Sequence, residues 1–244
     1  MIHKSILQSV ITKYYLGENE SVKWDINQNY LNIDFMSPNK EVIGNVNCND
    51  FNLQDSKLAI FDTRKLINLI SITNGELLLE LESQNAFFTK LKLSDSNYNL
   101  TYALSDPLLI GKVGTVNEQS YEISLRLEKE DIEALIKAKS ALVGIDNMKI
   151  NTTRNLDNEL VCEFIFGDEA GHNNKITYQI RGEIGVEDLN IPFKSDMFRS
   201  ILQANKDQDY GLLKLSSTGL LHLQFKSNLI SSEYYMIRKA DENF

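Results

Sequence analysis

The chain has 244 residues, of which 42% are hydrophobic, and its net charge at pH 7 is −9. It lacks the run of about 18 apolar residues that a membrane-spanning helix needs, and the helical pattern near the N-terminus argues against a signal peptide. The acidic balance argues against a chain that grips phosphates, unless the charge is segregated along the sequence.

The first predicted element is a two-faced helix at residues 3–15. Apolar residues recur there at the i, i+3 and i+4 spacing of one helix face. These residues are Ile6, Leu7, Val10, Ile11 and Tyr14. The polar face includes Lys4 and Lys13.

Short strands and a second helix complete the first half of the chain. Alternating apolar and polar residues predict strands at 21–26, 30–36, 41–48 and 58–61. The second helix, at 62–73, begins at a cap formed by Asp62 or Thr63 and ends before Gly75. Further strands are predicted at 76–82, 86–93 and 98–104.

Residues 105–120 have no clear period and contain Asp106, Pro107 and two glycines, so they are predicted to form an interdomain connector. The second half then repeats the order of the first. Helices are predicted at 128–142 and 195–206, and strands at 121–127, 147–153, 159–166, 176–183, 189–193, 212–216, 220–225 and 234–239. A surface loop that includes His172 is expected at 167–174.

Two pairs of helical segments indicate an internal duplication. Phe61 precedes a helix that starts near Thr63, and 132 residues later Phe193 precedes one that starts near Ser195. The earlier helices share apolar positions 125 residues apart: Leu7, Val10 and Ile11 against Ile132, Leu135 and Ile136. Two elements repeated in the same order predict two α+β domains, at 1–104 and 121–244.

Signatures of catalysis are absent from the sequence. It has no P-loop, no GxSxG and no HExxH, and its three histidines are scattered over different elements. Cys48 and Cys162 stand in strand-like stretches without CxxC spacing, which favours packed, reduced thiols. Acidic pairs such as Glu130 and Asp131 are more simply explained as exposed charge at a helix start. We expect no catalytic residue, no metal site and no cofactor.

The charge is segregated between the helices and the rest of the chain. The segments 3–16, 62–73, 128–142 and 194–206 carry ten basic and six acidic residues, whereas the remainder carries fifteen and twenty-eight. Five of the six helical acids lie near a helix start, where the macrodipole favours carboxylates. Basic residues therefore dominate the later turns, although any single lysine could belong to an ordinary solvated face.

Several segments match one known family in order and spacing. They are residues 58–62 at the entry to the second helix, the connector start at 106–107, helix residues 130–135 and the final segment 234–241. Together they resemble the sliding clamps, the ring-shaped processivity factors of DNA polymerases, most closely the clamp of T-even-type bacteriophages. The paired tyrosines of the last segment and Trp24, Asp25 and Ile26 are also similar to the eukaryotic clamp, proliferating cell nuclear antigen.

The resemblance implies a ring-shaped homotrimer with two clamp domains per chain, helices lining the inner face and antiparallel sheets outside. Such a ring encircles double-stranded DNA without reading its sequence and has no enzymatic activity. On this basis, the residues expected to face DNA are Lys4, Lys13, Arg64, Lys65, Lys137, Lys194, Arg199 and Lys206.

The resemblance also implies two protein interfaces. The subunit interface maps onto the strands 98–104 and 176–183, with Tyr98, Leu100, Thr101, Tyr102, Ile176, Tyr178, Gln179 and Ile180. Clamps dock partner peptides between the connector and the end of the last strand. That pocket maps onto Leu108, Leu109, Ile110, Tyr235, Met236 and Ile237, with strand alternation predicting Met236 outward and Ile237 inward.

The implied partners are a replicative DNA polymerase, an ATP-dependent clamp loader and transcription factors of a phage, in the cytoplasm of a bacterial host. No membrane partner is expected. An alternative from another class stays open, in which the chain is a non-enzymatic, β-rich structural or assembly protein of a virion or complex whose halves merely stack.

Overall fold

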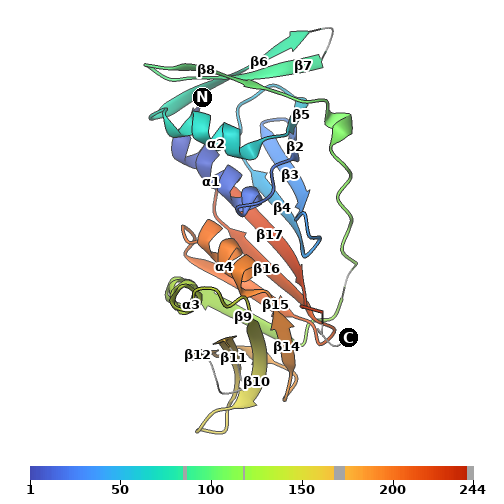
Figure 1. Cartoon of the computed structure of the whole chain (residues 1–244), viewed down its shortest axis with the longest axis vertical. Helices are drawn as coiled ribbons and strands as arrows, with labels where there is room; N and C mark the ends of the chain where they lie inside the picture. The colour runs from blue at the N-terminus through green and yellow to red at the C-terminus, as the bar shows by residue number, and fades with distance from the viewer. Residues whose placement is uncertain (85–86, 118, 168–173, 241–244) are drawn as a thin grey trace. The chain divides into compact units, whose positions relative to one another are not determined.

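The computed structural model describes residues 1–84, 87–117, 119–167 and 174–240 (Figure 1). The chain divides into two compact units. Unit 1 is Met1–Thr115 with Ser227–Ser232, and unit 2 is Val116–Lys226 with Glu233–Phe244. The first stretch of unit 1 therefore ends within the predicted connector at 105–120.

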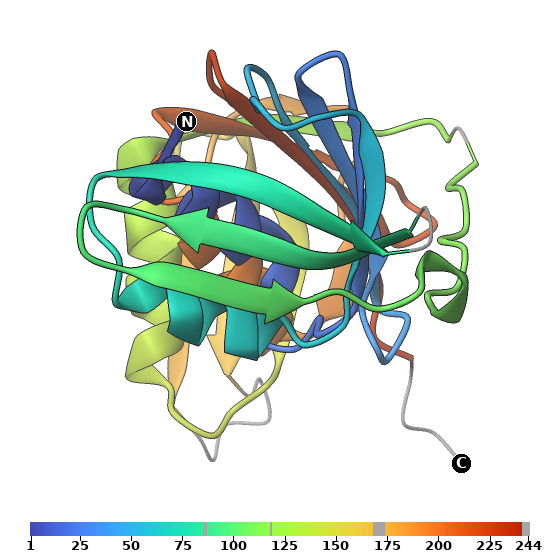
Figure 2. The same ribbon diagram turned by 90° about the horizontal axis from the view of Figure 1, so that it is seen from above.

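Unit 1 has two helices, α1 (Lys4–Tyr15) and α2 (Thr63–Ser71), and a 3-10 turn, η1 (Pro107–Leu109), in its described part. Its strands are β1 (Ile2–His3), β2 (Val22–Asn27), β3 (Tyr30–Met36), β4 (Val42–Cys48), β5 (Ser56–Ile60), β6 (Glu76–Gln84), β7 (Phe87–Ser94) and β8 (Asn99–Ala103). The strand orders are β1-β6-β7-β8 and β4-β3-β2-β5. Figure 2 shows β6, β7 and β8 side by side.

Unit 2 is built in the same way around α3 (Lys129–Ala141) and α4 (Ser195–Ala204). Its strands are β9 (Ile123–Glu128), β10 (Met148–Arg154), β11 (Leu160–Gly167), β12 (Lys175–Ile180), β13 (Glu183–Ile184), β14 (Asn190–Phe193), β15 (Tyr210–Leu215), β16 (Leu220–Lys226) and β17 (Ile230–Ile237), the first residues of β17 being counted with unit 1. The strand orders are β12-β11-β10-β14 and β9-β15-β16-β17, with β13 added beside β9.

The two units share one topology. In each, the strand before the first helix pairs with the strand after the second helix, as β1 with β6 and β9 with β15. The other sheet has matching orders, β4-β3-β2-β5 and β12-β11-β10-β14. The α+β class with antiparallel sheets is therefore as predicted, and the duplication read from the helices extends to the strand pairing.

Equivalent helix positions are buried in both units. Leu7 and Val10 of α1 are fully buried, and so are Ile132 and Leu135 of α3. The second helices repeat this pattern with their own apolar side chains, namely Leu66 and Ile70 in α2 and Phe198, Ile201 and Leu202 in α4. Burial of one apolar stripe per helix leaves the polar stripe of each helix facing away from its core.

A short polar residue anchors the start of the second helix in each unit. The Thr63 hydroxyl donates to the carbonyl oxygen of Glu20 at 2.9 Å, and the Ser195 hydroxyl donates to that of Ile145 at 3.2 Å. Both hydroxyl residues are fully buried. A carboxylate from the same loop accepts the next backbone N–H, since Glu20 accepts from Arg64 at 3.0 Å and Asp146 from Asp196 at 2.8 Å.

The cap predicted at Asp62 or Thr63 is formed by Asp62, and α3 has a cap that was not predicted. The Asp62 carboxylate accepts the Lys65 N–H at 2.8 Å at the start of α2, and Asp131 accepts the Glu128 N–H at 2.9 Å at the start of α3. Carboxylates at these positions bind N–H groups that have no partner within the helix.

The structure differs from the prediction at several strands. The strand predicted at 176–183 is broken, because β12 ends at Ile180 and β13 pairs with β9. Gly182 explains the break, since a Cβ there would lie 2.5 Å from the Leu125 side chain and 2.7 Å from the Ser124 carbonyl oxygen. The short β1 and η1 were not predicted, and β17 starts earlier than the strand predicted at 234–239. The expected loop with His172 lies outside the described residues, apart from its two ends.

Both cysteines are free and buried, as the spacing predicted. Burial raises the pKa of the Cys48 thiol to about 11 and that of Cys162 to about 12. Within the described ranges, none of the helices has the length and apolar character needed to cross a membrane.

We expect Thr63→Val to lower the free energy of unfolding of unit 1 by about 1 kcal/mol, because it removes a buried hydrogen bond while keeping the shape of the side chain. Urea unfolding followed by Trp24 fluorescence measures this, since Trp24 is the only tryptophan and is fully buried in unit 1. The control is Thr12→Val on the exposed face of α1, where we expect a change within about 0.5 kcal/mol. Equal losses in both variants would contradict an anchoring role for Thr63.

Candidate nucleic-acid interface and partner surfaces

The outer face of α2 carries the accessible cations of the unit 1 helices. Arg64 is 66% exposed, forms an ion pair with Glu20 at 3.2 Å and donates from Nε to the Tyr15 hydroxyl at 3.1 Å. Lys65 is exposed next to it. Ion pairs at such exposure contribute little, so the Arg64 guanidinium remains available to a phosphate.

Two other cations expected to face DNA have different roles in the structure. Lys13 is only 1% exposed and is therefore excluded from an open surface. It follows Val10 by three residues, at the border of the apolar stripe, where the neighbouring elements decide whether a side chain is covered. Lys4 is half-buried, and its ammonium donates to the carbonyl oxygens of Ser71 and Thr73 at the end of α2.

In unit 2 the outer faces of α3 and α4 carry the remaining predicted cations. Lys137 is 77% exposed and lies 3.5 Å from Glu133, one turn earlier on α3. Arg199 of α4 donates from Nε to the Ser140 hydroxyl of α3 at 3.0 Å, which fixes the guanidinium between the two helices. Lys206 is exposed just after α4, whereas Lys194 is half-buried at its start.

Lys139 was not predicted to have a special role, yet it is only 4% exposed and lies 2.9 Å from the Asp196 carboxylate. It therefore joins α3 to the first turn of α4 from within unit 2. Its sequence context gave no signal, because a lysine near the end of an amphipathic helix usually faces solvent.

The strands assigned to the subunit interface both lie at the end of a sheet. β8 pairs only with β7, and β12 only with β11, among the described strands. The Leu104 N–H donates to the Thr89 carbonyl oxygen at 2.8 Å. Because bonds alternate along an antiparallel ladder, the Tyr102 N–H also faces β7, while those of Thr101 and Ala103 face the open side.

The interface residues differ in how their side chains are placed. Thr101 and Gln179 are exposed, Tyr98 is 42% exposed, and Leu100, Ile176 and Tyr178 are half-buried. The side chains of Tyr102 and Ile180 are buried, contrary to what an interface role for them requires. The Tyr102 hydroxyl donates to the Asp62 carbonyl oxygen at 3.1 Å, so its side chain holds β8 to the start of α2.

The connector exposes apolar residues where it leaves unit 1. Leu108 is 88% exposed and Leu109 68% exposed, whereas Ile110 is half-buried. Asp106 accepts the Leu108 N–H at 2.8 Å and so fixes the turn η1. Large exposed apolar side chains are typical of a surface that binds another protein.

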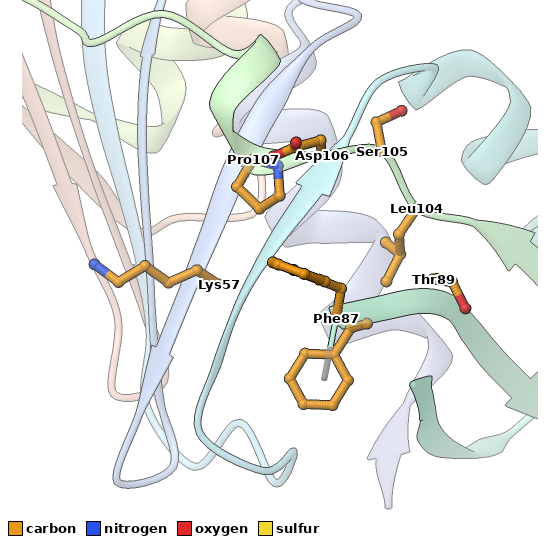
Figure 3. Close-up of a pocket in the computed structure, with 8 residues that line it drawn as sticks. Lys57, Phe87, Thr89, Leu104, Ser105, Asp106 and Pro107 are labelled. Atoms are coloured by element: carbon orange, nitrogen blue, oxygen red, sulfur yellow. The ribbon is translucent and has the colours of Figure 1, made fainter. Parts of the chain in front are cut away.

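A hollow of about 400 Å³ lies beside the start of the connector in unit 1. Its lining comes from β5, β7 and the connector, namely Lys57, Phe87, Phe88, Thr89, Leu104, Ser105, Asp106 and Pro107. Figure 3 shows Leu104 and Pro107 around this hollow together with Phe87, which is 70% exposed. The sequence did not predict the hollow, because its walls come from segments that are far apart in the chain.

The last strand presents the reverse of the alternation that was predicted. Met236 is 1% exposed and belongs to the core, whereas Ile237 is 51% exposed. Tyr234 determines which side chains of β17 point inward, because it is fully buried and its hydroxyl accepts a hydrogen bond from the Asn205 side-chain amide at 2.9 Å. Since side chains alternate along a strand, Tyr235 and Ile237 share the opposite face.

A polar cluster, made of Glu233 and its donors His222, Gln224 and Tyr235, lies on that opposite face in unit 2. One Glu233 carboxylate oxygen, Oε1, lies 2.5 Å from His222 Nε2 and accepts from the Gln224 amide at 2.8 Å and the Tyr235 hydroxyl at 2.9 Å. These hydrogen bonds lower the pKa of Glu233 to about 2, and the bond with His222 makes the largest contribution. Burial and the bond to Glu233 raise the pKa of Tyr235.

Comparison with solved structures identifies the fold. The chain is similar over 98% of its length to proliferating cell nuclear antigen (PCNA) of Entamoeba histolytica, with 96% of that chain covered, a TM-score of 0.75 and 13% identity. It is similar over 99% of its length to A. fulgidus PCNA with the C-terminal region of FEN-1 bound, with 98% of that chain covered, a TM-score of 0.77 and 14% identity.

The PCNA2–PCNA3 complex from Sulfolobus tokodaii gives 98% coverage of both chains, a TM-score of 0.75 and 12% identity. No protein-family model and no curated protein sequence matches the chain. At these identities the likeness is one of fold. The chain therefore has the fold of the PCNA sliding clamps.

The low pKa of Glu233 predicts a specific dependence of stability on pH. A carboxylate whose pKa falls on folding from 4.5 to about 2 stabilises the folded chain above pH 4.5 and loses this contribution as the pH falls toward 2. We expect the melting temperature of wild type to exceed that of Glu233→Gln above pH 5, and the difference to shrink between pH 4.5 and 2. Calorimetry from pH 7 to pH 2 measures it. A difference that does not vary with pH would contradict the prediction.

Proposed function

We propose that the chain is a DNA polymerase sliding clamp that encircles double-stranded DNA and tethers the replicative polymerase for processive synthesis. The observation that carries this proposal is the likeness in fold to PCNA over almost the whole of each compared chain. The segregated charge supports it independently. The helix cations that stay exposed, Arg64, Lys65, Lys137 and Lys206, could attract DNA while the rest of the chain carries a net negative charge.

The mechanism is topological and needs no catalytic group. A closed ring leaves duplex DNA only at an end, so strong binding to phosphates is unnecessary. Each strong phosphate contact would hinder sliding and make affinity fall steeply with salt. A few exposed cations on helices, such as Arg64, Lys65 and Lys137, attract the backbone without reading base sequence. The acidic remainder of the chain would repel DNA elsewhere.

In this proposal, the ring closes through the edge strands β8 and β12. A chain with domains at 1–104 and 121–244, joined by the connector 105–120, supplies two of the six domains of a trimeric ring. In a head-to-tail contact, β8 of one subunit pairs with β12 of the next. This pairing is favoured by the N–H groups on the open side of β8, those of Thr101 and Ala103, and by the exposed side chain of Gln179. Strand pairing would cover a sheet edge that otherwise invites aggregation.

The sequence resemblance suggests a clamp of the T-even bacteriophage type, acting in the cytoplasm of a bacterial host. Its further partners would be an ATP-dependent loader and phage transcription factors. Among the residues that the resemblance implies for partner-peptide binding, Leu108 and Leu109 expose apolar side chains in unit 1, and Tyr235 and Ile237 share one strand face in unit 2. C-terminal peptide binding has a precedent of the same fold, since the FEN-1 C-terminal region is bound to A. fulgidus PCNA.

We expect the double variant Lys65→Glu, Lys206→Glu to load more slowly and to leave circular DNA faster as salt rises. Both lysines are exposed at the second helix of their unit. Each lost phosphate contact lowers the slope of log affinity against log salt by about 1. The measurement is the loading rate and the half-life of the clamp on circular DNA at increasing sodium chloride.

The matched control is Lys40→Glu, Lys226→Glu, which has the same net charge but changes exposed lysines at a turn and at a strand end. We expect this control to behave like wild type. If both double variants lose DNA equally, net charge alone decides retention and the helix faces have no special role.

We expect Thr101→Pro to shift the protein from trimer toward monomer without unfolding unit 1. Proline removes an N–H that faces the open side of β8 and leaves the bonds to β7 in place. Light scattering at low micromolar concentration measures the mass, and circular dichroism checks the fold. Thr101→Ala keeps the N–H and should remain trimeric. A trimeric Thr101→Pro would rule out the pairing of β8. A monomer or open polymer for wild type would instead favour the structural or assembly protein.

A further inference from the structure

We propose that Glu233 is a positioning residue for partner binding. It holds the Tyr235 ring in one orientation, so that the ring is pre-organised for the hydrophobic anchor of a C-terminal peptide. This inference rests on the proposed clamp function and goes further, because it assigns a role to a polar cluster that clamp closure and DNA retention do not use.

Two contacts fix the Tyr235 side chain. Its hydroxyl donates to Glu233 Oε1 at 2.9 Å, and its ring stacks on His222 with centroids 4.3 Å apart and an interplanar angle of 7°. The hydroxyl bond fixes the far end of the ring, and the stack fixes its plane. One ring face is therefore covered by His222, and the partner can use only the other face and the edge.

The supports of Tyr235 are themselves held. His222 is 6% exposed, its Nε2 lies 2.5 Å from the same Glu233 oxygen, and Tyr121 lies on it at a centroid distance of 5.7 Å. The Gln224 amide donates to that oxygen as well, at 2.8 Å. Three donors converge on one carboxylate oxygen, so Glu233 determines the geometry of the whole cluster.

The neighbouring residues explain why orientation matters here. Ile237 is 51% exposed on the same strand face, two positions after Tyr235, so the two side chains form one apolar surface. A tyrosine that must be ordered during binding costs affinity, whereas one that is already ordered does not. The polar groups of the cluster thus contribute to binding through the orientation that they impose on Tyr235.

The experiment measures the affinity of a fluorescein-labelled peptide that copies the C-terminal tail of the replicative polymerase, by anisotropy, on the full-length chain. We expect Glu233→Ala to weaken binding about fivefold, the scale of ordering one side chain. Glu233→Gln should restore most of the affinity, because its amide oxygen still accepts hydrogen bonds. Glu80→Ala, an exposed glutamate of β6, is the control with the same charge change and should bind like wild type.

A double-mutant cycle separates positioning from a general structural effect. If Glu233 acts through the Tyr235 hydroxyl, Tyr235→Phe weakens binding, and Glu233→Ala combined with Tyr235→Phe is no weaker than Glu233→Ala alone. Additive losses, or Glu233→Ala with wild-type affinity, would overturn the inference. Melting temperature and trimer mass are measured on the same samples, and a loss of affinity that only follows a loss of trimer also overturns it.

Leu109→Ala distinguishes this inference from the proposed function. If Leu109→Ala weakens peptide binding while Glu233→Ala does not, the clamp proposal stands and the positioning role fails. If the wild-type chain does not bind the peptide at all, the tethering function fails and the positioning role with it.

Discussion

The arrangement of each unit depends on how the start of its second helix is held. A helix start has N–H groups without partners inside the helix, and a buried start needs donors and acceptors from elsewhere. In both units the loop after the first helix supplies them, through the carbonyl oxygen that accepts from Thr63 or Ser195 and the carboxylate of Glu20 or Asp146. This contact fixes the second helix against the first, and so fixes which side chains of both helices reach solvent.

The same contacts determine which cations of the helices are accessible. Asp146 accepts the Asp196 N–H at the start of α4, and the Asp196 carboxylate in turn pairs with Lys139, which is thereby drawn into unit 2. Lys4 binds the carbonyl oxygen of Ser71, the last residue of α2, and that of Thr73 just after it, where the helix dipole favours a cation. Four other cations of the helices stay exposed at the surface, namely Arg64, Lys65, Lys137 and Lys206. The outer face of the helices therefore carries few accessible cations, which fits the weak, sliding contact with DNA that we propose.

Periodicity predicted the elements well because each helix and strand buries one regular face. The repeat of Leu7 and Val10 as Ile132 and Leu135 marked the duplication that strand pairing then showed. Failures arose where burial depends on tertiary neighbours. Lys13 lies at the border of an apolar stripe, and the phase of β17 depends on the contact of Tyr234 with Asn205 of α4. The break at Gly182 depends on the close approach of β9. No local pattern contains that information.

The polar cluster around Glu233 illustrates why such sites also escape a sequence-based prediction. His222, Gln224, Glu233 and Tyr235 stand on two neighbouring strands, and each would be an ordinary exposed residue if it stood alone. Such a cluster stabilises the fold only when each polar group in it has a hydrogen-bond partner, because a buried polar group without a partner costs about 1–3 kcal/mol. A satisfied cluster stiffens the surface above it. On the proposed partner surface of Tyr235 and Ile237, stiffness of this kind would present the same shape to each partner.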